Sequence, residues 1–171
     1  MNTLQKQIFD VICGILSVDD IVSYYTESAI RYGILNYIAK YSLAKDTYFA
    51  TQKSLRHLET LQLMKDNKLR RGLKSTKLKF TYEHPIPANI IGEEIIKFHK
   101  NPDAIKKILS WTDVVTILTK EEDDILGQHF RSKMPKDWKF FESPKFARYE
   151  QSGIACEANL LSIQVYGKVS R

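Results

Sequence analysis

The stretch KLKFTYEHPIP, residues 77–87, separates a first half with helical periodicity from a second half that also contains strands. Residues 77–82 alternate in character and are rich in aromatic side chains, which predicts a β-strand. Pro85 and Pro87 end that strand, because proline has no N–H to donate to a sheet. Two more strands are predicted, at 114–118, a short apolar run, and within the last twenty residues, where 161–166 alternates.

Helical patterns account for most of the remaining sequence. Asn101-Pro102 is a favourable helix start, and Thr119-Lys-Glu-Glu122 reads as a capping box. Ser17-Val-Asp-Asp20 is predicted to open a helix in the same way. The helices expected are 4–16, about 20–41, 47–64, 89–99, 102–109 and 119–132. We therefore predict a helix-dominant α+β fold, an N-terminal helical bundle packed on a small β-containing C-terminal part.

The composition is that of one globular domain. The chain has 171 residues, of which 43% are hydrophobic and 27% are charged. Within the single domain 1–171 we distinguish a helical region, 1–64, a region with a basic hairpin and a candidate site, 65–132, and a basic aromatic segment, 133–171. There is no run of 18 apolar residues and no leader-like N-terminus, so we expect a soluble, cytoplasmic protein without a membrane partner.

Positive charge is concentrated in two short segments. The net charge is +6, and residues 65–79 hold seven basic side chains against one acidic. Clustered lysines and arginines neutralise phosphates and release counterions, so this segment predicts contact with nucleic acid, with DNA favoured over RNA. The alternative is a solvated hairpin. The predicted contacts are Lys68, Arg70, Arg71, Lys74, Lys77 and Lys79.

The second basic segment, 131–148, holds six basic and two acidic side chains. Lys136, Trp138 and Lys139 are candidate contacts, because aromatic residues among cations can stack on unpaired bases. For the aromatic residues we favour the alternative, packing in the core. The residues concerned are Trp138, Phe140, Phe141, Phe146 and Tyr149.

Glu83-His84-Pro85-Ile86-Pro87 places a histidine beside a carboxylate at the end of a predicted strand. This resembles the opening of the HNH, or ββα-metal, nucleases, in which an acid–histidine pair closes one strand and a second strand and a helix follow. The second strand would be 114–118 and the helix 119–132. The resemblance implies that His84 is the general base, and that Glu83 and His129 hold a divalent metal, Mg²⁺ or Mn²⁺.

The sequence departs from that family in two respects. The connection between the strands is long and contains two predicted helices, and the expected asparagine has only Asn89 and Asn101 as candidates. In the alternative interpretation His84 is a partly buried turn histidine. The acidic run at 121–124 is interpreted as first-turn charge that is stabilised by the helix dipole.

Residues 47–82 also resemble a winged-helix module. A helix bearing Lys53, Arg56 and His57 would precede a basic turn at 70–72 and the strand 77–82. In that family the helix enters the major groove and the wing contacts the backbone. This supports the alternative function of a non-catalytic DNA-binding regulator.

Six tyrosines between Tyr24 and Tyr48 suggest a core or a homodimer surface on the tyrosine-rich helices. Glycine-rich phosphate loops and nucleophile motifs are absent, which sets aside ATP-driven and dinucleotide chemistry. The leading hypothesis is a metal-dependent, HNH-like endonuclease of restriction, mobile-element or toxin type. A second alternative to it is a helical interaction factor that inhibits a partner enzyme.

Overall fold

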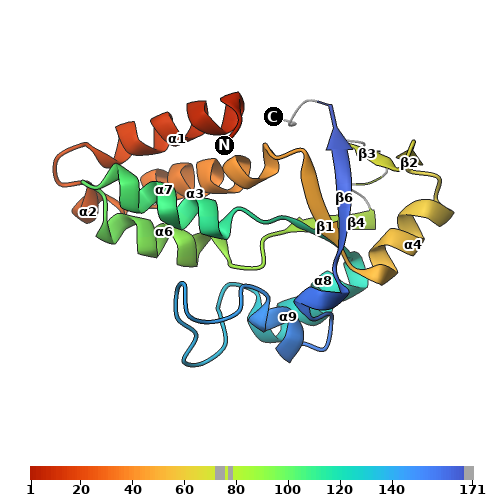
Figure 1. Cartoon of the computed structure of the whole chain (residues 1–171). Coiled ribbons are helices and arrows are strands. Elements are labelled where there is room, and N and C mark those ends of the chain that lie inside the picture. Colours follow the sequence, from red (N-terminus) through yellow and green to blue (C-terminus); the bar gives the residue numbers. More distant parts are fainter. Residues whose placement is uncertain (72–75, 77–78, 168–171) are drawn as a thin grey trace. The chain divides into compact units, whose positions relative to one another are not determined.

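The computed structural model of the chain describes residues 1–71, 76 and 79–167 (Figure 1). The chain forms two compact units. Unit 1 comprises residues 1–44 and 86–113, and unit 2 comprises residues 45–85 and 114–171. Unit 1 is helical and unit 2 contains a six-stranded mixed sheet with helices, so the predicted helix-dominant α+β class is confirmed. Lys74 and Lys77, two of the predicted nucleic-acid contacts, lie outside the described residues.

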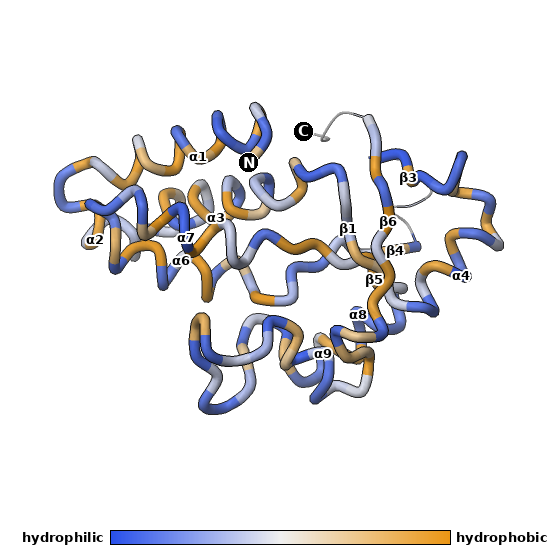
Figure 2. Tube along the Cα trace, in the orientation of Figure 1, coloured by the Kyte–Doolittle hydropathy of each residue, from blue (hydrophilic) through white to orange (hydrophobic). Residues whose placement is uncertain are grey.

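The helices of unit 1 pack through apolar side chains, among them Ile12, Ile38 and Ile95, which are buried. Figure 2 shows apolar and polar stretches alternating along these helices, the pattern of amphipathic helices that share a core. The helices are α1 (Thr3–Leu16), α2 (Ile21–Tyr24), α3 (Ser28–Leu43), α6 (Ala88–Lys97) and α7 (Pro102–Thr112).

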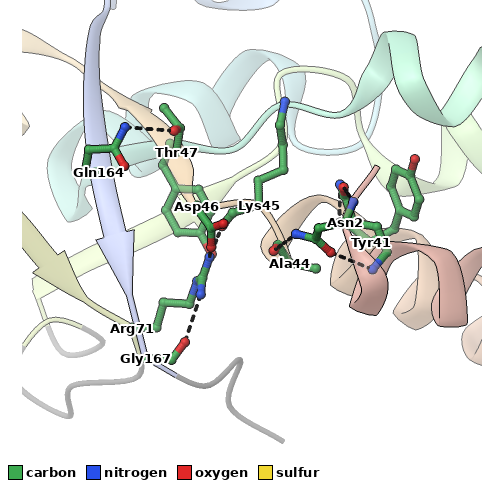
Figure 3. Close-up of polar contacts among 11 residues, drawn as sticks. Asn2, Tyr41, Ala44, Lys45, Asp46, Thr47, Arg71, Gln164 and Gly167 are labelled. Atoms are coloured by element: carbon green, nitrogen blue, oxygen red, sulfur yellow. Dashed lines mark hydrogen bonds and ion pairs between the residues drawn. The ribbon is translucent and has the colours of Figure 1, made fainter.

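The first turn of α1 is fixed by hydrogen bonds. Asn2 and Gln5 form a capping box, so two main-chain N–H groups at the helix start have acceptors. Asn2 Nδ2 also donates to the carbonyl oxygen of Ala44 at 2.9 Å, just beyond the end of α3 (Figure 3). The start of α1 is therefore joined to the end of α3 by a hydrogen bond to a main-chain acceptor as well as by apolar packing.

The predicted helix from about residue 20 to Tyr41 is wrong in its start. Ser17 is the C-cap of α1, and Asp20 adopts a left-handed conformation with φ of 59° before the four-residue helix α2. α3 begins only at Ser28. The Ser-x-x-Asp pattern here therefore closes one helix and starts a short one, because the αL residue breaks the helical path.

Unit 2 is built around the sheet order β2-β3-β6-β1-β5-β4. β1 is parallel to β5 and antiparallel to β6, while β4 is antiparallel to β5. At the other edge β3 is parallel to β6 and forms a hairpin with β2. The strands are β1 (Thr47–Ala50), β2 (Met64–Lys65), β3 (Lys68–Arg70), β4 (Phe80–Glu83), β5 (Thr116–Thr119) and β6 (Leu161–Tyr166). The helices are α4 (Gln52–Thr60), α8 (Lys120–Phe130), α9 (Ala147–Gln151) and the 3-10 helix Glu157–Asn159.

The strand at 161–166 is confirmed, and those predicted at 77–82 and 114–118 correspond to β4 and β5 with shifted ends. The helix predicted over 47–64 is wrong in its first turn, because residues 47–50 form β1. β1 lies between β5 and β6, so its main-chain groups are paired on both sides. That tertiary pairing outweighs the helical periodicity of the segment.

α4 and α8 lie on opposite faces of the sheet. Neighbouring residues of a strand point to opposite faces, and Phe80 contacts His57 of α4, with ring centroids 5.4 Å apart. Thr81 instead donates through Oγ1 to Asp123 of α8 at 2.8 Å. On the α8 face, Leu118, Leu126, Phe146 and Tyr149 form a buried cluster with α9.

Gly92 tests the packing of unit 1. A Cβ at this position in α6 would collide with the Tyr25 hydroxyl and lie 2.8 Å from Leu35 Cδ2. We expect Gly92→Ala to lower the free energy of unfolding by about 1–3 kcal/mol, measured by urea denaturation. Gly33→Ala in α3, where a Cβ meets nothing within 4 Å, is the control and should raise it by about 0.5–1 kcal/mol. Equal effects of the two substitutions would contradict this packing.

Candidate nucleic-acid interface and adjoining clefts

β4, β5 and α8 follow one another in the order that the sequence predicted. β4 and β5 pair antiparallel, with Glu83 opposite Thr116 and Phe80 opposite Thr119. α8 begins directly after β5 with the predicted capping box, in which Thr119 Oγ1 accepts from the Glu122 main chain at 3.2 Å. The long connection between the strands contains α6 and α7. Glu83 and His84 therefore stand at the end of a strand that packs beside α8.

Arg148 of α9 engages the end of β4. Its side chain is completely buried, and it forms an ion pair with Glu83. The guanidinium also donates to the carbonyl oxygens of Pro85 and Phe130, at 2.7 and 2.8 Å, and of His84. Burial raises the pKa of Glu83, and the charge of Arg148 opposes that rise. Arg148 thus holds the end of β4 and the end of α8 in fixed positions.

A cleft of about 740 Å³, called here the Glu83 cleft, opens beside this ion pair. Asp123 accepts from Thr81, whose hydroxyl in turn accepts from Lys120 Nζ at 2.9 Å. The cleft therefore combines carboxylates with guanidinium groups. Its lining residues are Thr81, Glu83, Asp123, Asp124, Leu126, Gly127, Gln128, Arg131 and Arg148.

The predicted metal ligands do not come together. His129 is exposed beside Phe130 and does not line the Glu83 cleft, and neither does half-buried His84. The reason lies in the helix period: Gly127 faces the cleft, and His129 is displaced from it by roughly 200° around α8. Within the described part of the chain, no group of three or more His, Cys, Asp or Glu side chains is placed to hold a metal ion. These residues do not fit the implied metal, and we derive no metal-assisted step.

The first basic segment forms a hairpin with exposed cations. Asp66 and Asn67 both have positive φ, 51° and 57°, which suits the two-residue turn between β2 and β3. Leu69 of β3 is buried, whereas Lys65, Lys68 and Arg70 are exposed. The basic turn that the sequence suggested at 70–72 includes Gly72, which lies outside the described residues. Lys79, close to the start of β4, is exposed as well.

Arg71 has a structural role that the sequence did not reveal. Its guanidinium donates to Tyr48 Oη at 3.2 Å, to Gly167 O at 2.8 Å and to the carbonyl oxygen of Lys45. It also pairs with Asp46 at 3.1 Å, and only 10% of its side chain is exposed (Figure 3). Because these donors join the start of β1 to the end of β6, we do not count Arg71 among the phosphate contacts.

The second basic segment separates into surface cations and packed aromatic residues. Lys136 and Lys139 are exposed, and Lys139 lies 3.6 Å from Glu142. Trp138 is half-buried, donates through Nε1 to Pro144 O at 2.9 Å, and meets the Phe140 ring edge-on at 5.0 Å. Phe146 and Tyr149 lie in the core, as the packing alternative predicted, while Phe141 is exposed.

A second cleft, called here the α4 cleft, was not predicted from the sequence. It has a volume of about 810 Å³ and lies between α4, α8 and the segment that follows α9. The available signal was the Lys53, Arg56, His57 spacing, which the winged-helix resemblance assigned to a major groove. Its lining residues are Thr51, Gln52, Lys53, Arg56, His57, Thr60, Glu122, Ile125, Gly153, Ile154, Ala155 and Asn159.

In comparisons with known proteins, the chain matches no family model, no curated protein and no solved structure. None of the helices that the structure describes has both the length and the apolar character needed to cross a membrane.

Arg148→Met tests the buried ion pair. Methionine has a similar length but no donors, so Glu83 and three carbonyl oxygens would lose their partner. We expect the free energy of unfolding to fall by about 3–5 kcal/mol, measured by chemical denaturation. Lys139→Met, which removes an exposed cation, should change it by no more than about 0.5 kcal/mol. An Arg148→Met protein as stable as the wild type would contradict the anchoring role of this residue.

Proposed function

We propose that this protein binds nucleic acid, with duplex DNA as the favoured ligand, through the β2–β3 hairpin. The observation that carries the proposal is the set of exposed cations on one short hairpin: Lys65, Lys68 and Arg70. No carboxylate among the described residues lies within ion-pair distance of these three side chains. Their charges are therefore available to phosphates.

The hairpin spaces its cations regularly. Lys68 and Arg70 are two residues apart on β3, so they share a face of the strand and lie roughly 6–7 Å from each other. On the neighbouring strand β6, Tyr166 is opposite Arg70 in the register and is exposed. A row of cations beside an exposed aromatic ring suits a phosphodiester backbone.

The helix before the hairpin supports the same proposal. α4 carries exposed Arg56 and His57, and β2 follows it after three residues. A helix followed by a basic hairpin is the order that the winged-helix resemblance implies. That order favours a DNA-binding regulator as the biological role, with the hairpin contacting the backbone.

The triple variant Lys65→Ala, Lys68→Ala, Arg70→Ala tests the proposal. Fluorescence anisotropy with a labelled 20-base-pair duplex should show affinity that falls steeply with salt for the wild type. The variant should bind at least about tenfold more weakly. The slope of its log K against log[salt] should be smaller in magnitude by roughly 2–3, because binding with three fewer phosphate contacts releases fewer counterions.

The matched control replaces three exposed lysines of unit 1, Lys100, Lys106 and Lys107, by alanine. It removes the same charge but should keep the salt slope of the wild type. If both triple variants lose affinity equally, or if the hairpin variant binds normally, the hairpin is not the contact surface.

A hydrolytic activity on nucleic acid is the second candidate function. The observation that favours it is the order β4, β5, α8, with His84 directly after the end of β4. His84 is the candidate base in the HNH-like hypothesis. The carboxylates that α8 supplies to the Glu83 cleft, Asp123 and Asp124, lie near the start of that helix.

Plasmid and total RNA incubated with Mg²⁺, Mn²⁺ or EDTA test this candidate. His84→Ala should slow any cleavage by about 10²–10⁴-fold while nucleic-acid binding persists. Because His129 is exposed and lies outside the Glu83 cleft, we expect His129→Ala to be tolerated, and His99→Ala likewise. Cleavage that is absent under all conditions, or unchanged in His84→Ala, removes the second candidate and leaves the binding function untouched.

A further inference from the structure

The α4 cleft lies at the carboxyl ends of the two adjacent strands β1 and β5. β1 and β5 are adjacent and parallel, and each runs directly into a helix, α4 and α8, that begins with a threonine cap. The two helices lie on opposite faces of the sheet, as the contacts of Phe80 and Thr81 show. In sheets with parallel strands, the carboxyl ends at such a point form a crevice that binds ligands. Thr51 and Glu122 of these helix starts line the α4 cleft.

One wall of the cleft is cationic. Lys53, Arg56 and His57 are three and four residues apart on α4, so they share one side of the helix. Lys53 pairs with Glu121 at 2.6 Å, but no acidic side chain in the described ranges is in ion-pair distance of Arg56. Glu122, the carboxylate that lines the cleft among the residues described, accepts from the Thr119 N–H at 2.8 Å and from the Ser54 hydroxyl at 3.0 Å. Arg56 is thus the charge available to an anionic ligand.

The remaining walls suit a flat ring. Ile125, Ile154 and Ala155 present apolar surface, and Gly153 adds no side chain. On the α4 side, the His57 ring meets Phe80 edge-on at 66°, which limits how it can turn. A volume of about 810 Å³ is within the ordinary range for small-ligand sites. The cleft therefore offers an aromatic ring, aliphatic side chains and a guanidinium within one concave surface.

We propose that the α4 cleft takes a single unpaired nucleotide, with its phosphate at Arg56 and its base between His57 and Ile154. Stacking on aromatic rings beside a cation is how unpaired bases are held without sequence preference. The inference deepens the proposed function, because it adds recognition of an unpaired nucleotide to the backbone contacts of the hairpin. The ligand could be a nucleotide of a strand or a free nucleotide, which share the same chemistry.

The first test uses a free nucleotide and does not depend on duplex binding. Adenosine 5′-monophosphate, titrated to millimolar concentration into ¹⁵N-labelled full-length protein, should shift the amide resonances of residues 51–60 and 153–159. Adenosine without the phosphate should bind at least about tenfold more weakly, because it lacks the partner of Arg56. Absence of shifts in those two segments would overturn the proposal.

Two variants assign the binding to the cleft. Ile154→Trp fills the cleft. Arg56→Ala removes the available cation at an exposed position, where the substitution has little effect on folding. Each variant should bind adenosine 5′-monophosphate about tenfold or more weakly than the wild type. Arg56→Lys should restore part of that loss. If either cleft variant, folded by its amide spectrum, binds the monophosphate as the wild type does, the cleft is not the site.

A last comparison separates this inference from the proposed function. A duplex with a five-nucleotide single-stranded overhang should bind wild type more tightly than a blunt duplex, and Arg56→Ala should abolish that difference. The Lys65, Lys68, Arg70 triple variant should weaken both duplexes equally. A wild-type protein that does not bind the blunt duplex would contradict the role of the hairpin and leave the cleft untouched. An overhang preference that survives in Arg56→Ala would refute the cleft.

Discussion

A fully buried guanidinium has to find acceptors for its donors, and in this protein Arg148 finds them at the end of β4 and the end of α8. Its charge is paired with Glu83, which is itself largely withdrawn from water. Removing either partner would leave the other buried and uncompensated. The position of β4 beside α8, and with it the shape of the Glu83 cleft, depends on this ion pair and its three main-chain bonds.

The same ion pair limits what the Glu83 cleft can do. A carboxylate that already faces a guanidinium is a poor ligand for a metal ion, and α8 turns Asp123 rather than His129 toward it. Exposed cations lie elsewhere in unit 2, among them those of the β2–β3 hairpin and of one side of α4. Both belong to the continuous segment 52–70, on which the proposed binding function rests.

Part of this arrangement could be predicted from local sequence. Several features depend on residues within a few positions of each other: the caps at Asn101 and Thr119, the alternation in 161–166 and the strand patterns of β4 and β5. The local sequence patterns gave wrong predictions where contacts with residues distant in the sequence determine the structure. Residues 47–50 became β1 because β5 and β6 pair with them on both sides, and Arg71 was withdrawn from the surface by Asp46 and Gly167.

The sequence by itself determined the helix-rich class, most element positions and the concentration of positive charge in 65–79. Which of those cations are exposed, and what Glu83 faces, was decided only by the tertiary structure. The physical reason is sequence separation: Arg148 meets Glu83 across 65 positions, and Arg71 meets Gly167 across 96. Local propensities act over one or two turns, whereas such pairs depend on the order of strands in the sheet. The α4 cleft exists for the same reason, since parallel pairing of β1 with β5 brings the starts of α4 and α8 together.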